Sequence, residues 1–140
     1  MKRSIIFFVA ALILSSCRDS AIKNNFYGNY FLIASDVGEG LALCYQEHVD
    51  DSNYGTIIGA TVFALGYNSK FIVVKQHPRT FPNLPNKEIT NYFILPIKRG
   101  FDWREMNGLM GPFTQKQFRN ERDALHIGDI EFTIVHKDLE

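Results

Sequence analysis

The chain has 140 residues, of which 46% are hydrophobic and 21% are charged, and this balance is typical of a globular protein. The length predicts a single domain, large enough to form a core without disulfides or metal ions. The 15 basic and 15 acidic residues balance, so no excess of positive charge is available to bind phosphates. We therefore exclude nucleic acid as a partner, and nothing in the composition predicts a cofactor.

The first 16 residues have the layout of a secretory signal. Lys2 and Arg3 are positively charged, residues 5–14 are all apolar, and Ser15 and Ser16 are small. As a helix, the apolar run would reach only about 15 Å at ~1.5 Å per residue. A bilayer core of ~30 Å needs about 20 residues, so we expect a cleaved signal (residues 1–16) and not a transmembrane helix.

Leu14-Ser15-Ser16-Cys17 resembles the lipobox of bacterial lipoproteins. The resemblance implies cleavage before Cys17 and a diacylglycerol on its sulfur, which would anchor the chain to a membrane of the cell envelope. Arg18 stands where Asp often retains such proteins in the inner membrane, so the outer membrane is favoured in a host with two. The alternative is an ordinary secretory signal with an incidental cysteine.

After a lipidated cysteine and polar tether (residues 17–27), we expect one folded domain over residues 28–140. Short apolar and aromatic runs predict its strands. Asn68-Ser69 predicts a hairpin turn, the prolines of residues 77–86 predict a loop, and Gly59 predicts a bulge or bend. The expected strands cover residues 29–34, 41–46, 60–67, 70–76, 89–95 and 130–136.

One helix is expected over residues 114–127. Thr114 and Gln117 have the spacing of a capping box, and Phe113 and Phe118 occupy the positions of a hydrophobic staple. Gly128 is the expected C-terminal stop. Together these elements predict an α+β fold, mainly antiparallel: a sheet or open barrel of about six strands with the helix on one face. A β-sandwich is the alternative architecture.

The residue types that carry chemistry form no recognisable catalytic pattern. His48, Asp50, Asp51 and Asn53 are the densest polar cluster, but Val62 stands where a calcium loop would need a carboxylate, so we interpret the cluster as a solvated turn. No common hydrolase motif is present. Cys44 lies in an apolar run, which favours burial over nucleophilic reactivity.

The segment 100–112 is the most informative candidate site. It is rich in Trp, Met and Arg, which are enriched in protein interfaces, so Trp103, Arg104 and Met106 are the predicted partner-binding residues. The alternative is a compact loop that packs its own aromatic side chains over the sheet.

Three segments, residues 66–78, 90–94 and 111–114, are similar to those of a functionally uncharacterised family of small bacterial lipoproteins. That resemblance implies an envelope location and no particular activity. We therefore expect a lipid-anchored envelope protein that acts by binding another protein, with an inhibitor or immunity protein as one concrete form. A small envelope hydrolase with sequence-distant catalytic residues, or a carrier of a small apolar ligand, remain as alternatives.

Overall fold

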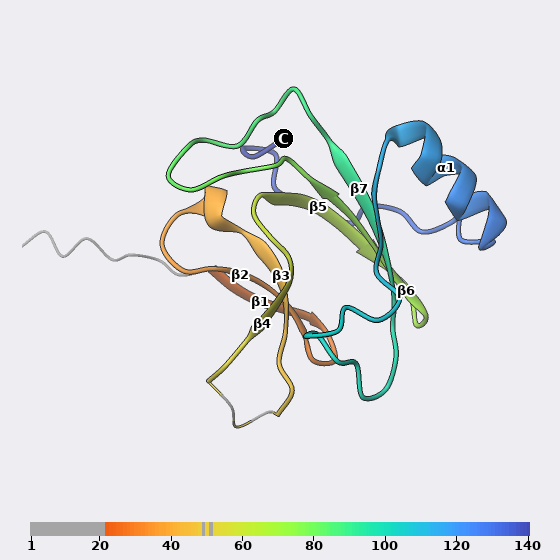
Figure 1. Ribbon diagram of the computed structural model, residues 1–140, viewed down its shortest axis with the longest axis horizontal. Helices are drawn as coiled ribbons and strands as arrows, with labels where there is room; N and C mark the ends of the chain where they lie inside the picture. Colours follow the sequence, from red (N-terminus) through yellow and green to blue (C-terminus); the bar gives the residue numbers. More distant parts are fainter. Residues whose placement is uncertain (1–21, 49, 51) are drawn as a thin grey trace, which may run out of the picture.

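The computed structural model describes residues 22–48, 50 and 52–140, and these form two antiparallel sheets and one α-helix (Figure 1). The first sheet has the order β1-β2-β3-β4, with β1 (Ile22–Tyr27), β2 (Tyr30–Ala34), β3 (Ala42–Tyr45) and β4 (Gly55–Ile58). The second has the order β8-β7-β6-β5-β9, with β5 (Val62–Tyr67), β6 (Phe71–Gln76), β7 (Asn91–Pro96), β8 (Met110–Phe113) and β9 (Ile134–Val135). A short 3-10 helix η1 (Gly38–Gly40) precedes β3, and helix α1 (Gln115–Ala124) follows β8.

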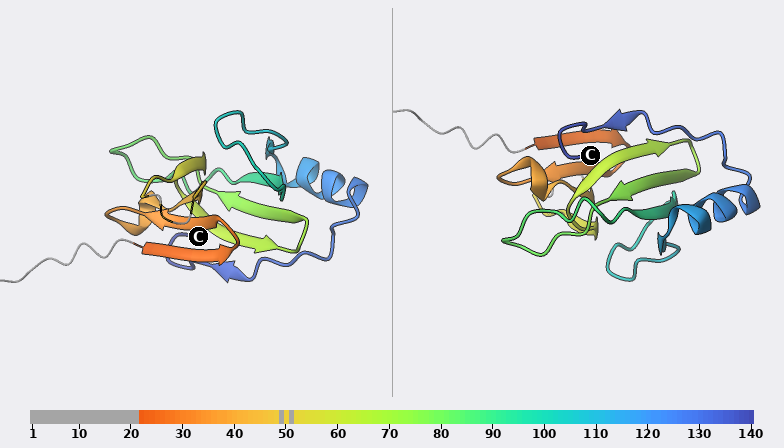
Figure 2. Two further views of the ribbon diagram at one scale, coloured as in Figure 1. Left: turned by 90° about the horizontal axis from the view of Figure 1, so that it is seen from below. Right: turned by 90° about the horizontal axis from the view of Figure 1, so that it is seen from above.

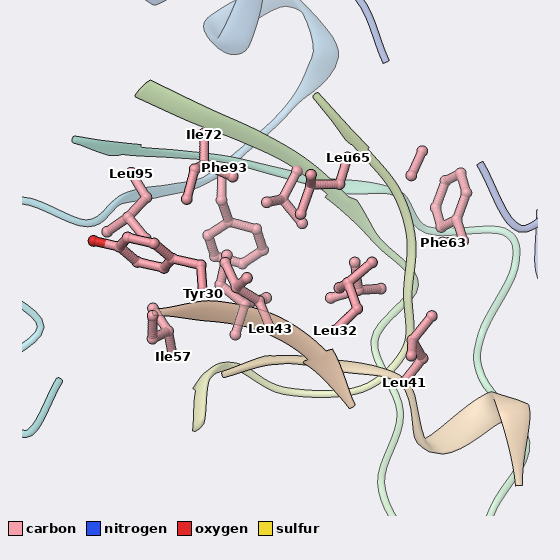
Figure 3. Close-up of a cluster of buried hydrophobic side chains, with 14 of the residues drawn as sticks. Tyr30, Leu32, Leu41, Leu43, Ile57, Phe63, Leu65, Ile72, Phe93 and Leu95 are labelled. Carbon is pink, nitrogen blue, oxygen red and sulfur yellow. The ribbon is translucent and has the colours of Figure 1, made fainter. Parts of the chain in front are cut away.

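The expected fold class, mainly antiparallel β with one helix in the C-terminal half, is confirmed. Both sheets are open and pack face to face, which is the arrangement of the sandwich alternative. Side chains from the first sheet, such as Leu32 and Leu43, meet Leu65 and Phe93 of the second (Figure 3). The core therefore lies between the sheets, and the part of the chain that the structure describes contains no helix long and apolar enough to cross a membrane.

The second sheet is covered on both faces. Ile72 and Val74 of β6 point into the core between the sheets, whereas Val73 packs with Phe118 of α1 on the opposite face. Successive residues of a strand point to opposite faces, so a strand that is covered on both sides is apolar throughout. This explains why the first four residues of β6, Phe71 to Val74, are all apolar, and Figure 2 shows α1 beside the second sheet.

The helix begins as predicted. Thr114 is the N-cap, its hydroxyl accepts a hydrogen bond from the Gln117 backbone N–H, and the Gln117 side chain accepts one from the Thr114 N–H. The expected C-terminal end was wrong: the helix stops at Ala124, and His126, not Gly128, takes the left-handed conformation (φ 55°). The Arg122 guanidinium donates to the backbone carbonyls that follow the helix and holds this reversal.

Three other expectations need correction. Residues 22–27, which were expected to belong to the tether, form β1, an edge strand held mainly by backbone pairing with β2. The β5–β6 hairpin turns at Ser69-Lys70, one residue later than expected, because the Asn68 side chain accepts hydrogen bonds from the Lys70 and Phe71 N–H groups. The last strand is only Ile134–Val135, since the chain before it packs against the second sheet without ladder pairing.

Candidate binding groove at Trp103 and Arg104

The segment between β7 and β8 closes one end of the core. Phe101 is buried and its ring centroid lies 6.0 Å from that of Tyr30 and 5.3 Å from that of Tyr45. Met106 is partly buried against the same core and has a left-handed backbone (φ 51°). The compact-loop alternative therefore describes Phe101 and Met106, and in part Trp103, which also packs against this core.

Trp103 lies against the start of β4. A Cβ atom built on Gly55 would come closer than 3.0 Å to three atoms of the indole ring, so the ring rests directly on the strand backbone. On the ring, the Arg104 guanidinium carbon lies 4.7 Å from the centroid, within the range of a cation–π contact. The partly exposed indole thus lies between Gly55 and the Arg104 guanidinium, and it also packs against the core.

A surface groove of about 590 Å³ opens beside Trp103 and Arg104. Its lining also includes Tyr54, whose ring packs edge-on against Phe31 at 5.2 Å and lies 4.7 Å from the Lys23 ammonium. The remaining lining consists of Glu47, Ser52, Asn53 and Gly55. Two aromatic side chains, a guanidinium and a carboxylate together can contact a polypeptide surface through both apolar and charged groups.

An ion pair forms part of the lining of the groove. Arg104 Nη1 lies 3.3 Å from Glu47 Oε2, and the two side chains are 59% and 48% exposed. Pairs this exposed contribute little to stability, about 0–1 kcal/mol, so a charged partner can displace either member at small cost. Glu47 also lines a second hollow of about 460 Å³ with His48 and Asp102, so this carboxylate is shared by two neighbouring depressions.

The predicted site is only partly assembled. The structure brings Trp103 and Arg104 to the groove and places Met106 against the core, away from the groove lining. Sequence reasoning missed Glu47, Tyr54 and Gly55, which come from the segment interpreted as a solvated turn and from the strand after it. Their nearness to Trp103 arises from a contact between distant parts of the chain, which no local spacing in the sequence indicates.

The other candidate groups lie elsewhere. Cys44 is buried on β3; burial raises the pKa of its thiol, and a long contact with the Thr56 hydroxyl at 3.9 Å opposes the rise. A thiol kept neutral by burial is a poor nucleophile, in agreement with the packing interpretation. Cys17, the expected lipidation site, and Asp51 lie outside the described residues, and among those described no three His, Cys, Asp or Glu side chains gather as a metal site.

Fold and groove define a class of protein: a small two-sheet β domain with one helix and an aromatic groove on its surface. The chain belongs to the family described as a protein of unknown function (DUF3997), whose model matches residues 27–139. No curated protein and no solved structure gives a match. The family, like the resemblance seen in the sequence, assigns no activity.

Proposed function

We propose that this protein is a lipid-anchored component of the bacterial cell envelope that binds another envelope protein through the groove at Trp103 and Arg104. An inhibitor or immunity protein, which blocks its partner by contact, is the form that a domain of this size fits best. The outer membrane is the proposed location in a host with two membranes. The lipid on Cys17 would keep the domain at the surface where its partner is concentrated.

The observation that carries the binding role is the arrangement of Trp103. Its ring is fixed between the Gly55 backbone and the Arg104 guanidinium, at the edge of a groove of about 590 Å³. A fixed aromatic side chain loses little conformational entropy on binding, which is why Trp and Arg dominate the energetics of many interfaces. The exposed Glu47–Arg104 pair adds charges that a partner can match.

The lipid anchor is tested by labelling cells that express the full chain with an alkyne analogue of palmitate. Wild-type protein should carry the label, and Cys17→Ser should not. Cys44→Ala is the matched control, because it removes the only other cysteine and should leave labelling unchanged. Labelling of Cys17→Ser would overturn the anchor.

The binding role is tested by crosslinking the full chain in intact envelopes and isolating its complexes. One partner in stoichiometric amount is expected with the wild type and should be lost with Arg104→Glu, which reverses the charge at the groove. Lys116→Glu makes the same change of charge on the exposed face of α1 and should keep the partner. Absence of a partner, or equal capture by Arg104→Glu, would contradict binding through this groove.

A further inference from the structure

The loop between β6 and β7 (residues 77–90, the β6–β7 loop) exposes apolar side chains in an unusual way. Phe81 and Leu84 are 78% and 77% exposed, the two highest values among the large hydrophobic side chains described. Loops in water are usually polar, and a group of exposed apolar side chains marks an interaction surface. The groove at Trp103 contains none of these residues, so they need a separate explanation.

The base of the β6–β7 loop is held firmly. The His77 ring stacks on Phe63 with centroids 4.2 Å apart, and its Nδ1 lies 2.7 Å from the Ile89 carbonyl oxygen. The Asn86 N–H donates to the Pro78 carbonyl at 2.9 Å. Within the tip, the Arg79 side chain donates to the Asn83 carbonyl at 2.8 Å. These contacts fix the backbone of the loop that carries Phe81 and Leu84.

The loop lies at the end of the molecule where the chain enters β1. Ile22 is paired with Ala34, so β1 starts where β2 leads into η1. Glu39 of η1 and Leu84 line one hollow of about 210 Å³, which places η1 beside the β6–β7 loop. Figures 1 and 2 show the start of β1, η1 and this loop together at one end in every view.

The groove at Trp103 lies at the opposite end of the first sheet. The pairs Tyr30–Tyr45 and Tyr45–Gly55 align there, next to Tyr27 at the other end of β1, five positions from Ile22. At about 3.3 Å per residue, β1 separates the two ends by roughly 17 Å. The β6–β7 loop thus lies at one end of the first sheet and the groove at the other.

We infer that the β6–β7 loop docks onto the lipid bilayer, with Phe81 and Leu84 inserted between the headgroups. This inference rests on the lipid anchor proposed above. Cys17 is five residues before Ile22, and a fully extended chain covers ~3.3–3.6 Å per residue, so an acylated Cys17 holds Ile22 within about 17 Å of the membrane. The end that carries the exposed apolar side chains is then the end nearest the lipid.

Two further features fit a bilayer surface. The Arg79 guanidinium lies 5.8 Å from the Phe81 ring, where it can meet a lipid phosphate while the ring enters the apolar layer. Two inserted side chains hold a protein on a membrane only weakly, but the anchor supplies a high local concentration. Docking would also orient the domain, with the groove at Trp103 directed away from the membrane toward soluble or membrane-bound partners.

The inference is tested with a variant that carries Phe81→Trp and Trp103→Phe, so that its single tryptophan lies in the β6–β7 loop. The lipidated chain is placed in phosphatidylcholine–phosphatidylglycerol vesicles whose acyl chains are brominated and therefore quench tryptophan fluorescence. Emission from the introduced tryptophan should fall about twofold, because an interfacial group is buried ~5–10 Å into the headgroup–acyl boundary. Trp103 in the wild-type chain is the reference and should be unaffected. Adding Leu84→Asp should relieve the quenching of the introduced tryptophan, whereas Asn83→Asp, a matched change in the same loop, should not.

The outcomes separate this inference from the anchor. If the chain floats with the vesicles but the introduced tryptophan is not quenched, or is quenched no more than Trp103, membrane docking of the loop is overturned while the anchor stands. If the chain carries no lipid, the free thiol of Cys17 is coupled to a maleimide lipid, since Cys44 is buried. Quenching of the introduced tryptophan in that coupled form supports docking, and its absence overturns it.

Discussion

Substitution of Gly55 by alanine tests the placement of the indole on which the proposed groove depends. The new methyl group would lie closer than 3.0 Å to Cδ2, Cε2 and Cγ of Trp103. Ordinary carbon–carbon contacts are about 3.5–4.0 Å, so the ring must retreat by more than ~1 Å to relieve the overlap. The φ angle of Gly55 is outside the left-handed region, so alanine introduces no backbone strain of its own.

Two opposing contributions determine the expected loss of stability. Overpacking at a close contact costs about 1–3 kcal/mol. Replacing glycine by alanine also restricts the unfolded chain, which returns about 0.4–1 kcal/mol. The net expectation for Gly55→Ala is a decrease of roughly 1–2 kcal/mol in the free energy of unfolding, the overpacking being the larger of the two.

The assay is urea denaturation followed by fluorescence, because Trp103 is the only tryptophan in the chain. In Gly55→Ala, native-state emission should move to longer wavelength and acrylamide quenching should increase as the ring leaves the strand. Gly59→Ala is the matched control: its Cβ would meet nothing within 4 Å, so emission should match wild type and stability should not fall. Unchanged emission and stability in Gly55→Ala would refute the placement of Trp103 on β4 and remove the support for the groove.

Three further predictions concern the cap, the core and a close approach of two segments. Thr114→Ala should lower the free energy of unfolding by about 1 kcal/mol through loss of the helix cap, with the exposed Thr133→Ala as control; equal midpoints in urea would exclude a role for the cap. Burial, with a smaller contribution from the neighbouring Tyr45, raises the pKa of Tyr30 from 10.0 to about 12. The stabilisation from this shift is intact below pH 10 and is lost as the pH rises toward 12. Between these pH values the free energy of unfolding should therefore fall less in Tyr30→Phe than in the wild type, as measured by urea denaturation at each pH. Gly66→Ala places a methyl group closer than 3.0 Å to a backbone oxygen of the segment before β9 and should cost about 2 kcal/mol or more, measured by thermal unfolding; a wild-type midpoint would show that the two segments are not in contact.

Local signals in the sequence predicted several elements well. The capping box at Thr114 defines the start of α1 by hydrogen bonds between residues three apart, and such contacts are visible in the sequence itself. Apolar runs likewise predicted β5, β6 and β7. Strand β1 was missed because Lys23-Asn24-Asn25 lacks apolar alternation and is held by pairing with β2. The reversal at His126 was missed because side-chain contacts from Arg122, not glycine, stabilise it.

The sequence by itself determined the class of fold, the helix start and the buried character of Cys44, because each depends on the period of apolar residues or on neighbours a few positions apart. It could also single out Trp103 and Arg104 as unusual residues for a loop. Only the tertiary structure decided that Trp103 rests on Gly55, that Glu47 meets Arg104, and that the apolar β6–β7 loop lies beside the start of β1. Each of these contacts joins segments that are distant in the chain, and its geometry depends on how the two sheets pack and not on any local pattern.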